Sequence, residues 1–515
     1  MRVSELARDR LLGDRFTEAA WRQSNLPASA RAELDELVDR IQAYDERIAA
    51  ADDIVERVRL ESGRTLAVGE RGRLERRLRD ALQLAMPAFR PPTLDELREV
   101  LAAGTALVAV THSGDTWWAL VIRRDAPARF VAFADPDLGR NAAAWLRRLR
   151  GEPARAWPLP GGRIGVQWTR PDAATGPYLS PAALGARLAG SLLAPLRDAL
   201  GGARRLVFVG DDELVGVPLQ ALPLGRGRAL DHYEFSYAPS LATYARWQSG
   251  ARAAGRPIAP SPAASGRGRG PEAGFERDLL AIGAIDADRG ARPADDVAAA
   301  AAPLPFARAE LAAIATLFPR DRVTSWIGAQ ASKSRLRQAS QSGALRGYRY
   351  VHFATHAWAR SDPPESSAIA LAAEADPARA ESLPGAEAPV GSDGAAVTMR
   401  GGAITAAELA GLDMAADLIV LSACDTGLGR FEHGRGLLGL AYASLAAGNR
   451  AALLSLWPVA DDTTADFMQR LYVHLHAGLA PPAALAATQR EFMRSADARR
   501  ADPLVWAAFV VYGAY

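Results

Sequence analysis

Residues 418–427 read Leu-Ile-Val-Leu-Ser-Ala-Cys-Asp-Thr-Gly, an apolar run that ends in a cysteine and a glycine turn. Four branched apolar residues followed by turn-forming residues predict a buried β-strand that stops where the turn begins. Cys424 stands at that point, and it is the single cysteine of the chain. The stretch therefore predicts a strand that presents a thiol at its carboxyl end.

A second strand of the same kind lies upstream and ends in a histidine. Residues 350–355, Tyr-Val-His-Phe-Ala-Thr, favour a strand because aromatic and β-branched residues dominate, and His356 follows directly. Adjacent parallel strands end at one edge of a sheet, so we expect Cys424 and His356 to meet there. An imidazole beside a thiol takes its proton and makes the sulfur a nucleophile. We interpret the two residues as a candidate cysteine peptidase dyad, with His356 as general base and acid.

Further groups near the dyad complete a candidate site. The backbone N–H groups of Cys424 and Ala357 are the candidate oxyanion-hole donors, each contributing about 3 kcal/mol in the transition state. Two aspartates at 461–462 open a predicted helix, either as N-caps or as the acidic wall of a pocket for a basic P1 residue. The candidate pocket residues are Asp425, Glu432, Asp461 and Asp462.

His352 and His356 also permit a metal interpretation, because histidines four residues apart on a helix form a zinc motif. On a strand the same spacing separates the two residues by about 13 Å, at about 3.3 Å per residue, which is too far to share one ion. We therefore expect no metal and no cofactor, and we expect a structural role for His352.

Composition limits the class of protein. The 515 residues are 49% hydrophobic, enough for two or three domains at about 100–200 residues each. The 61 basic and 59 acidic side chains give a net charge of +2, which does not favour nucleic-acid binding. A single cysteine excludes an intrachain disulfide, and neither a secretory signal nor a membrane span of about 18 apolar residues is recognisable. We expect a cytoplasmic protein that binds neither nucleic acid nor membrane.

Hydrophobic periodicity divides the chain into three regions. A stripe spaced three and four residues apart predicts a helical hairpin or short bundle over residues 1–90, with an internal seam or a partner site formed by Leu34, Leu37, Ile41, Tyr44 and Ile48. Strands and helices alternate over 93–250 and over 270–515, with loops expected at 250–275 and 373–402. This alternation predicts an α/β fold, a mainly parallel sheet flanked by helices. One helix is expected from Ser180 to Leu200, with Ser180 as its N-cap.

Five ordered blocks carry a family resemblance: His-Phe-Ala-Thr-His at 352–356, Leu-Ser-Ala-Cys-Asp-Thr-Gly-Leu-Gly at 421–429, Gly-Leu-Leu-Gly-Leu-Ala-Tyr at 436–442, Ser-Leu-Trp-Pro-Val-Ala-Asp-Asp at 455–462, and Trp-Ala-Ala-Phe-Val-Val-Tyr-Gly at 506–513. Together they resemble the CHAT domain, a caspase-like cysteine peptidase domain of clan CD that is often attached to tetratricopeptide repeats. The resemblance is strong over 270–515 and weaker over 93–250. It implies a caspase-like catalytic half that follows a pseudo-caspase-like half and the α-helical extension.

The resemblance places the family's dyad on His356 and Cys424. It implies an endopeptidase that cleaves a specific partner protein in a bacterial defence or regulated-death system, such as antiphage defence, under a separate protein activator or sensor. Two departures are Ala357, where members usually have glycine, and the absence of a 34-residue repeat in residues 1–90. The alternative is a catalytically silent caspase-like scaffold that binds partner proteins.

Overall fold

The computed structural model describes most of the chain. The described residues are 29, 33, 36, 37, 40, 41, 44, 47, 54–81, 92–149, 155–159, 163–167, 180–211, 214–253, 274–283, 304, 306–358, 367–372, 402–422, 435–457 and 459–513. For some of them, including both strands between 155 and 167, only the backbone is described.

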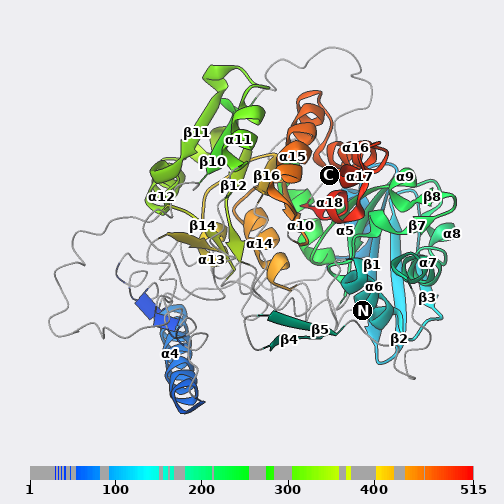
Figure 1. Ribbon diagram of the computed structural model, residues 1–515, viewed down its shortest axis with the longest axis horizontal. Helices are drawn as coiled ribbons and strands as arrows, with labels where there is room; N and C mark the ends of the chain where they lie inside the picture. The colour runs from blue at the N-terminus through cyan, green and yellow to red at the C-terminus, as the bar shows by residue number, and fades with distance from the viewer. Residues whose placement is uncertain are drawn as a thin grey trace.

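One eleven-stranded sheet forms the centre of the described structure (Figure 1). From edge to edge its strands are β11 (Val323–Ile327), β10 (Arg277–Gly283), β12 (Tyr348–Ala354), β16 (Leu418–Ser422), β17 (Ala451–Ser455), β18 (Phe509–Gly513), β9 (Glu234–Tyr237), β6 (Arg205–Val209), β1 (Thr105–Ser113), β2 (Thr116–Arg123) and β3 (Ala126–Phe133). Seven of the ten strand pairings described in this sheet are parallel. The antiparallel β17–β18 pairing joins two parallel blocks that run in opposite directions.

Helices cover both faces of this sheet. In chain order the described helices are α4 (Ile54–Ala81), α5 (Leu94–Val100), α6 (Leu138–Leu149), α7 (Pro181–Leu192), α8 (Arg197–Leu200), α9 (Ala229–His232), α10 (Leu241–Ala253), α11 (Ala307–Ala315), α12 (Lys333–Gln341), α13 (Ala406–Ala410), α14 (Arg435–Ala446), α15 (Asp461–His476), α16 (Pro481–Met493), α17 (Ala498–Ala501) and α18 (Pro503–Trp506). Helix α4 is not part of this cover, because it projects away from the central sheet (Figure 1). None of these described helices has both the length and the hydropathy that crossing a bilayer requires.

Three small sheets accompany the central one. The strands β13 (Ala357–Trp358), β14 (Ala368–Ala370) and β15 (Ala403–Thr405) form the first, β4 (Arg155–Leu159) and β5 (Arg163–Gln167) the second, and β7 (Pro223–Leu224) and β8 (Gly227–Arg228) the third. The first of them begins directly after β12, so it lies at the edge of the central sheet where we expect the site.

Strand alternation explains how β1 is buried on both faces. Leu107 belongs to the hydrophobic cluster that contains Leu97 of α5 and Tyr244 of α10. Its neighbour Val108 belongs to the larger cluster that contains Leu188 of α7. Because successive side chains of a strand point to opposite faces, each face of β1 needs its own helical cover. The predicted α/β class, a mainly parallel sheet flanked by helices, is confirmed.

The helix expected from Ser180 to Leu200 is wrong as one continuous element. The Ser180 hydroxyl does cap its start, accepting a hydrogen bond from the N–H of Ala183 at 3.2 Å. However, α7 ends at Leu192 and α8 begins only at Arg197. Pro195 lies between them, and a proline lacks the N–H of a helix interior and clashes with the preceding turn.

The N-terminal helical segments pack against each other in the part of the chain that the structure describes. Leu37 and Ile41 are 8% exposed, and Leu60, Ala67 and Leu74 of α4 are buried. Ion pairs Arg40–Glu70 and Arg77–Glu33 connect the same two segments in antiparallel order. Leu34 and Ile48 of the expected seam are outside the described side chains. Figure 1 shows α4, in blue, projecting away from the central sheet.

Substitution of Gly448 by alanine should destabilise the fold strongly. This glycine follows α14 with φ of 103°, and an added Cβ would lie 2.3 Å from the carbonyl oxygen of Met414. Gly478 follows α15 with φ of 91°, but no described atom lies within 4 Å of its added Cβ. We expect Gly478→Ala to cost about 1 kcal/mol of backbone strain and Gly448→Ala about 2 kcal/mol more, because the overlap is with backbone. Urea unfolding of both variants measures this difference, and equal costs would contradict it.

Candidate functional site

His356 lies at the carboxyl end of β12, in the turn that leads into β13. Its carbonyl oxygen accepts a hydrogen bond from the N–H of Ala370 at 2.8 Å. The hydroxyl of Thr355 donates to the carbonyl oxygen of Ala370 at 3.1 Å. These two bonds attach the turn to β14 and leave the His356 side chain half-buried at the sheet edge.

The register of β12 and β16 relates the two dyad positions. The parallel pairing ends at Ala354 opposite Ser422. His356 is two residues beyond Ala354, and Cys424 is two residues beyond Ser422. Cys424, Asp425 and Glu432 lie outside the described residues. The described parts of β12 and β16 therefore end side by side. Two residues of chain separate each strand end from its candidate dyad residue.

Strand pairing fixes the direction of the Ala357 N–H. Ala357 faces Ile369 in the antiparallel β13–β14 pairing, next to the hydrogen-bonded pair of His356 and Ala370. Hydrogen-bonded and non-hydrogen-bonded pairs alternate along such a ladder, so the N–H of Ala357 points away from β14. That direction is compatible with a donor to an oxyanion. The methyl group of Ala357 is buried, and the residue is 2% exposed.

A buried polar network surrounds His352, four residues before His356 in the chain. His352 of β12 places Nε2 2.7 Å from Oε1 of Glu310 on α11, and Nδ1 3.2 Å from the hydroxyl of Tyr472 on α15. All three side chains are at most 2% exposed. Burial raises the pKa of Tyr472 well above its usual range, so its O–H stays protonated and donates to Nδ1 while Nε2–H donates to Glu310. His352 therefore has the structural role expected from the sequence.

The described residues do not form a metal site. Within the parts of the chain that the structure describes, no three histidine, cysteine, aspartate or glutamate side chains group closely enough to hold an ion. His352 lies on a strand, as the sequence predicts, and its two ring nitrogens are hydrogen-bonded to Glu310 and Tyr472.

Asp461 connects the beginning of α15 with the beginning of α11. Its Oδ2 accepts a hydrogen bond from the N–H of Phe306, which immediately precedes α11, at 2.7 Å. Burial raises the pKa of Asp461, the bond from Phe306 lowers it, and the nearby Glu310 and His356 act in opposite directions. The Asp461 carboxylate is therefore directed at the beginning of α11.

The Asp462 carboxylate has different partners from that of Asp461. It accepts hydrogen bonds from Arg499 at 2.7 Å and from the N–H of Thr463 at 2.8 Å, and the Arg499 bond lowers its pKa. The prediction that Asp461 or Asp462 is the N-cap of this helix is wrong. The N-cap of α15 is Ala460, which has no side-chain capping bond, and both carboxylates lie within the first turn. Their negative charge is favourable there because the N-terminal end of a helix is electropositive.

Sequence reasoning missed Glu310 and Tyr472, which contact His352, and Phe306, which contacts Asp461. A signal for Glu310 was present, because it shares the buried face of α11 with Ala307, Leu311 and Ile314. An acid on an otherwise apolar helix face requires a buried partner. Neither the identity of that partner nor the approach of α11 to α15 is encoded in local spacing.

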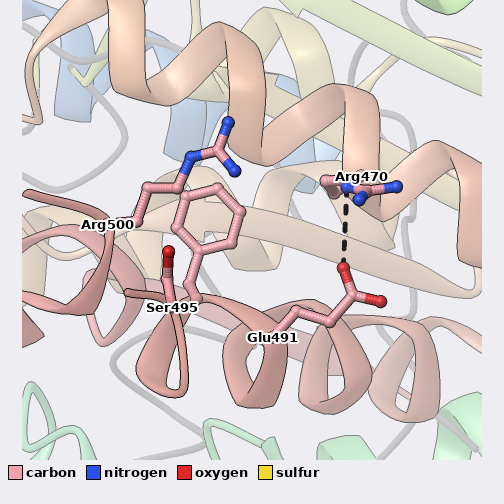
Figure 2. A pocket seen from close by; sticks show the side chains of 5 residues that line it. Arg470, Glu491, Ser495 and Arg500 are labelled. Carbon is pink, nitrogen blue, oxygen red and sulfur yellow. Dashed lines mark ion pairs between the residues drawn. The ribbon is translucent and has the colours of Figure 1, made fainter. Parts of the chain in front are cut away.

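A surface depression between α15, α16 and α17 contains none of the expected site residues (Figure 2). Arg470 extends toward Glu491 with a separation of 3.6 Å, and Arg500 pairs with Asp466 at 2.7 Å. The Arg500 guanidinium also stacks over the ring of Phe492 at 5.6 Å. Both arginines therefore already have acidic partners, and we assign no ligand to this depression.

Comparisons with known proteins agree with the sequence resemblance. The family model described as the CHAT domain matches residues 182–514. Tetratricopeptide repeat protein 28 of Mus musculus is 35% identical over 112 residues, which are 21% of this chain and 4% of that protein. The chain therefore spans a small fraction of this relative's length.

Two solved structures share a general likeness with the fold. The Saccharomyces cerevisiae separase–securin complex gives a TM-score of 0.41 at 10% identity, over 87% of this chain and 31% of the matched chain. The Arg-specific cysteine proteinase gingipain R gives a TM-score of 0.36 at 10% identity, over 73% of this chain and 74% of that chain.

Proposed function

Because this chain belongs to the CHAT domain family, we propose that it is a caspase-like cysteine endopeptidase with a Cys424–His356 dyad. The observation that carries the proposal is the register of β12 and β16, in which Ala354 pairs with Ser422 and each dyad residue follows two positions later. Neighbouring parallel strands lie about 4.8 Å apart, a separation that a histidine and a cysteine side chain bridge.

The proposed reaction is acyl transfer through the thiol. His356 takes the proton of Cys424, and the sulfur attacks the carbonyl carbon of the scissile peptide bond. The N–H groups of Cys424 and Ala357 donate to the oxyanion of the tetrahedral intermediate. His356 then gives the proton to the leaving amine, which breaks the C–N bond and leaves a thioester. Water, deprotonated by His356, hydrolyses the thioester and restores the thiol.

We propose that the substrate is a specific partner protein, and that a separate protein activates the enzyme in a bacterial defence or regulated-death system in the cytoplasm. The partial match to tetratricopeptide repeat protein 28 supports an association with such repeats. Asp425 and Glu432 remain candidates for an acidic pocket that accepts a basic P1 residue. Asp462 is a weaker candidate because Arg499 already neutralises it.

Cleavage of a mixture of peptides by the wild-type protein and by Cys424→Ala tests the peptidase proposal. The incubation is run with and without lysate of the native host, which supplies an activator, and mass spectrometry identifies the cut positions. We expect cuts that appear only with wild-type protein, with arginine or lysine at P1. If neither condition produces a cysteine-dependent cut, the peptidase proposal fails and the scaffold alternative replaces it.

A further inference from the structure

The two edge strands of the central sheet differ in how they are protected against pairing with another chain. Strand β3 contains Pro127, which has no N–H to donate, and the charged Arg129. Its register with β2 also shifts between Val121 and Arg123. Proline, charge and irregular pairing keep edge strands from associating. Strand β11 reads Val-Thr-Ser-Trp-Ile, without proline or charge, and its register with β10 is regular.

The outer side of β11 carries unpaired backbone groups in the described part of the chain. Strand β10 pairs with the inner side of β11. To the other described residues, the β11 backbone makes one hydrogen bond, from the N–H of Val323 to the carbonyl oxygen of Arg320. Figure 1 shows β11 and β3 at opposite ends of the sheet. An edge strand of this kind is a template for a further strand.

Two side chains of β11 are bound within the chain and fix the strand. The guanidinium carbon of Arg335, on α12, lies 4.9 Å from the centroid of the Trp326 ring. The hydroxyl of Tyr348 donates to Oγ1 of Thr324 at 3.0 Å. The side chains on the opposite face of the strand are exposed or half-buried: Val323, Ser325 and Ile327. These three side chains are therefore available to a neighbouring strand.

The β11 sequence is complementary to itself in antiparallel order. With a two-fold axis at Ser325, Val323 of one copy lies opposite Ile327 of the other, and the two small Ser325 side chains lie opposite each other. Pairs of β-branched side chains stabilise antiparallel ladders. At the end of the strand, Arg322 lies opposite Gly328, so like charges do not meet there. A contact between identical surfaces closes as a dimer.

We propose that β11 pairs with β11 of a second copy of this chain about a two-fold axis at Ser325, so that the two central sheets become continuous. Because β11 is parallel to β12 and β16, and antiparallel to its copy, the two candidate dyads lie at opposite edges of the joined sheet. A single pair of edge strands is a small interface, so we expect a dimer that dissociates on dilution. The inference does not depend on the proposed dyad.

Disulfide trapping tests the pairing and its register. In a Cys424→Ala background the chain has no cysteine, so Ser325→Cys introduces a single thiol. Opposite residues of an antiparallel pair have Cα atoms about 4.5–5.5 Å apart, which is within the range of a disulfide. We expect mild oxidation to convert Ser325→Cys into a covalent dimer on a non-reducing gel. The substitution is small and the site is exposed, so the fold should be kept.

Two matched variants in the same background control for register and for random collision. Two copies of Val323→Cys would have their thiols about 13 Å apart, at about 3.3 Å per residue, which is too far for a disulfide. Phe130→Cys places a thiol on the other edge strand, where the native side chain is 69% exposed. We expect both variants to remain monomeric. Trapping of either control as readily as Ser325→Cys would overturn the inference.

Sedimentation equilibrium of the full chain measures the reversible dimer. Ser325→Lys places like charges opposite each other at the axis, so we expect it to raise the Kd of the dimer at least about tenfold. An equimolar mixture of Ser325→Lys and Ser325→Asp should restore dimer formation. A wild-type chain that is monomeric at every concentration would contradict the proposal and leave the β11 edge to a strand of another protein. A mixture that stays monomeric while the wild-type chain dimerises would place the contact elsewhere.

Discussion

Replacement of His356 by glutamine should lower kcat/KM for peptide cleavage by at least about 10⁴-fold, while the free energy of unfolding stays nearly unchanged. The side chain is half-buried at the edge of the sheet, so its loss removes a proton acceptor without opening the core. Cys424→Ala should reduce cleavage equally, and the double variant should be no worse than either single variant, because the dyad acts as one unit. Cleavage rates and urea unfolding of the three proteins measure both effects.

His352 provides the matched control for this prediction. It lies four residues earlier, on β12, but is fully buried and bound to Glu310 and Tyr472. We expect His352→Gln to lower the free energy of unfolding by about 2 kcal/mol, because it leaves a buried polar group unsatisfied. Any loss of cleavage should then follow the loss of folded protein. Retained cleavage in both His356→Gln and Cys424→Ala would contradict the proposed dyad.

Removal of the Glu310 carboxylate should destabilise the protein by about 2–3 kcal/mol, since Glu310→Ala leaves Nε2 of His352 without its hydrogen-bond partner in the core. The bond between Oε1 and Nε2 is 2.7 Å long and excluded from water. Glu310→Gln should cost less, because the amide oxygen still accepts the hydrogen bond from Nε2. Equilibrium unfolding in urea measures each variant.

A surface pair of the same chemistry is the control for Glu310. Glu491 accepts from Nε2 of His474 at 2.9 Å, but the Glu491 side chain is 45% exposed and also approaches Arg470 (Figure 2). We expect Glu491→Ala to cost at most about 1 kcal/mol, because exposed pairs are screened and solvated. Equal losses in the free energy of unfolding for Glu310→Ala and Glu491→Ala would contradict this prediction, because burial would then not explain the stability that the Glu310–His352 pair contributes.

Much of the sheet was predictable because its strands are apolar runs bounded by turn residues. The strand at 418–422 and the strand that precedes His356 are found where the sequence places them, and in adjacent parallel order. Strand β18 was not predicted, although its residues 509–513 belong to the last of the five family blocks, at 506–513. Its position between β17 and β9 depends on pairing between segments distant in sequence. Local pattern contains no information on such pairing.

The partners of the two aspartates at 461–462 were less predictable than the position of His356 after β12. Asp461 and Asp462 are adjacent in sequence and looked equivalent as caps or pocket residues. The structure separates them, because Phe306 binds the first and Arg499 binds the second. Both partners come from other elements, so only the tertiary arrangement distinguishes the two carboxylates. The helix break at Pro195, by contrast, could be predicted from the sequence, because proline lacks the N–H that a helix interior requires.

The most direct measurement of the central claim is the alkylation rate of Cys424 at pH 7, read by intact mass. Because the chain has one cysteine, every label reports on this thiol. The wild-type protein, exposed to host lysate and then purified, should react with iodoacetamide at least about tenfold faster than His356→Gln and faster than the urea-unfolded chain. Equal rates for the wild-type protein and His356→Gln, with and without lysate, would contradict an imidazole-activated thiol.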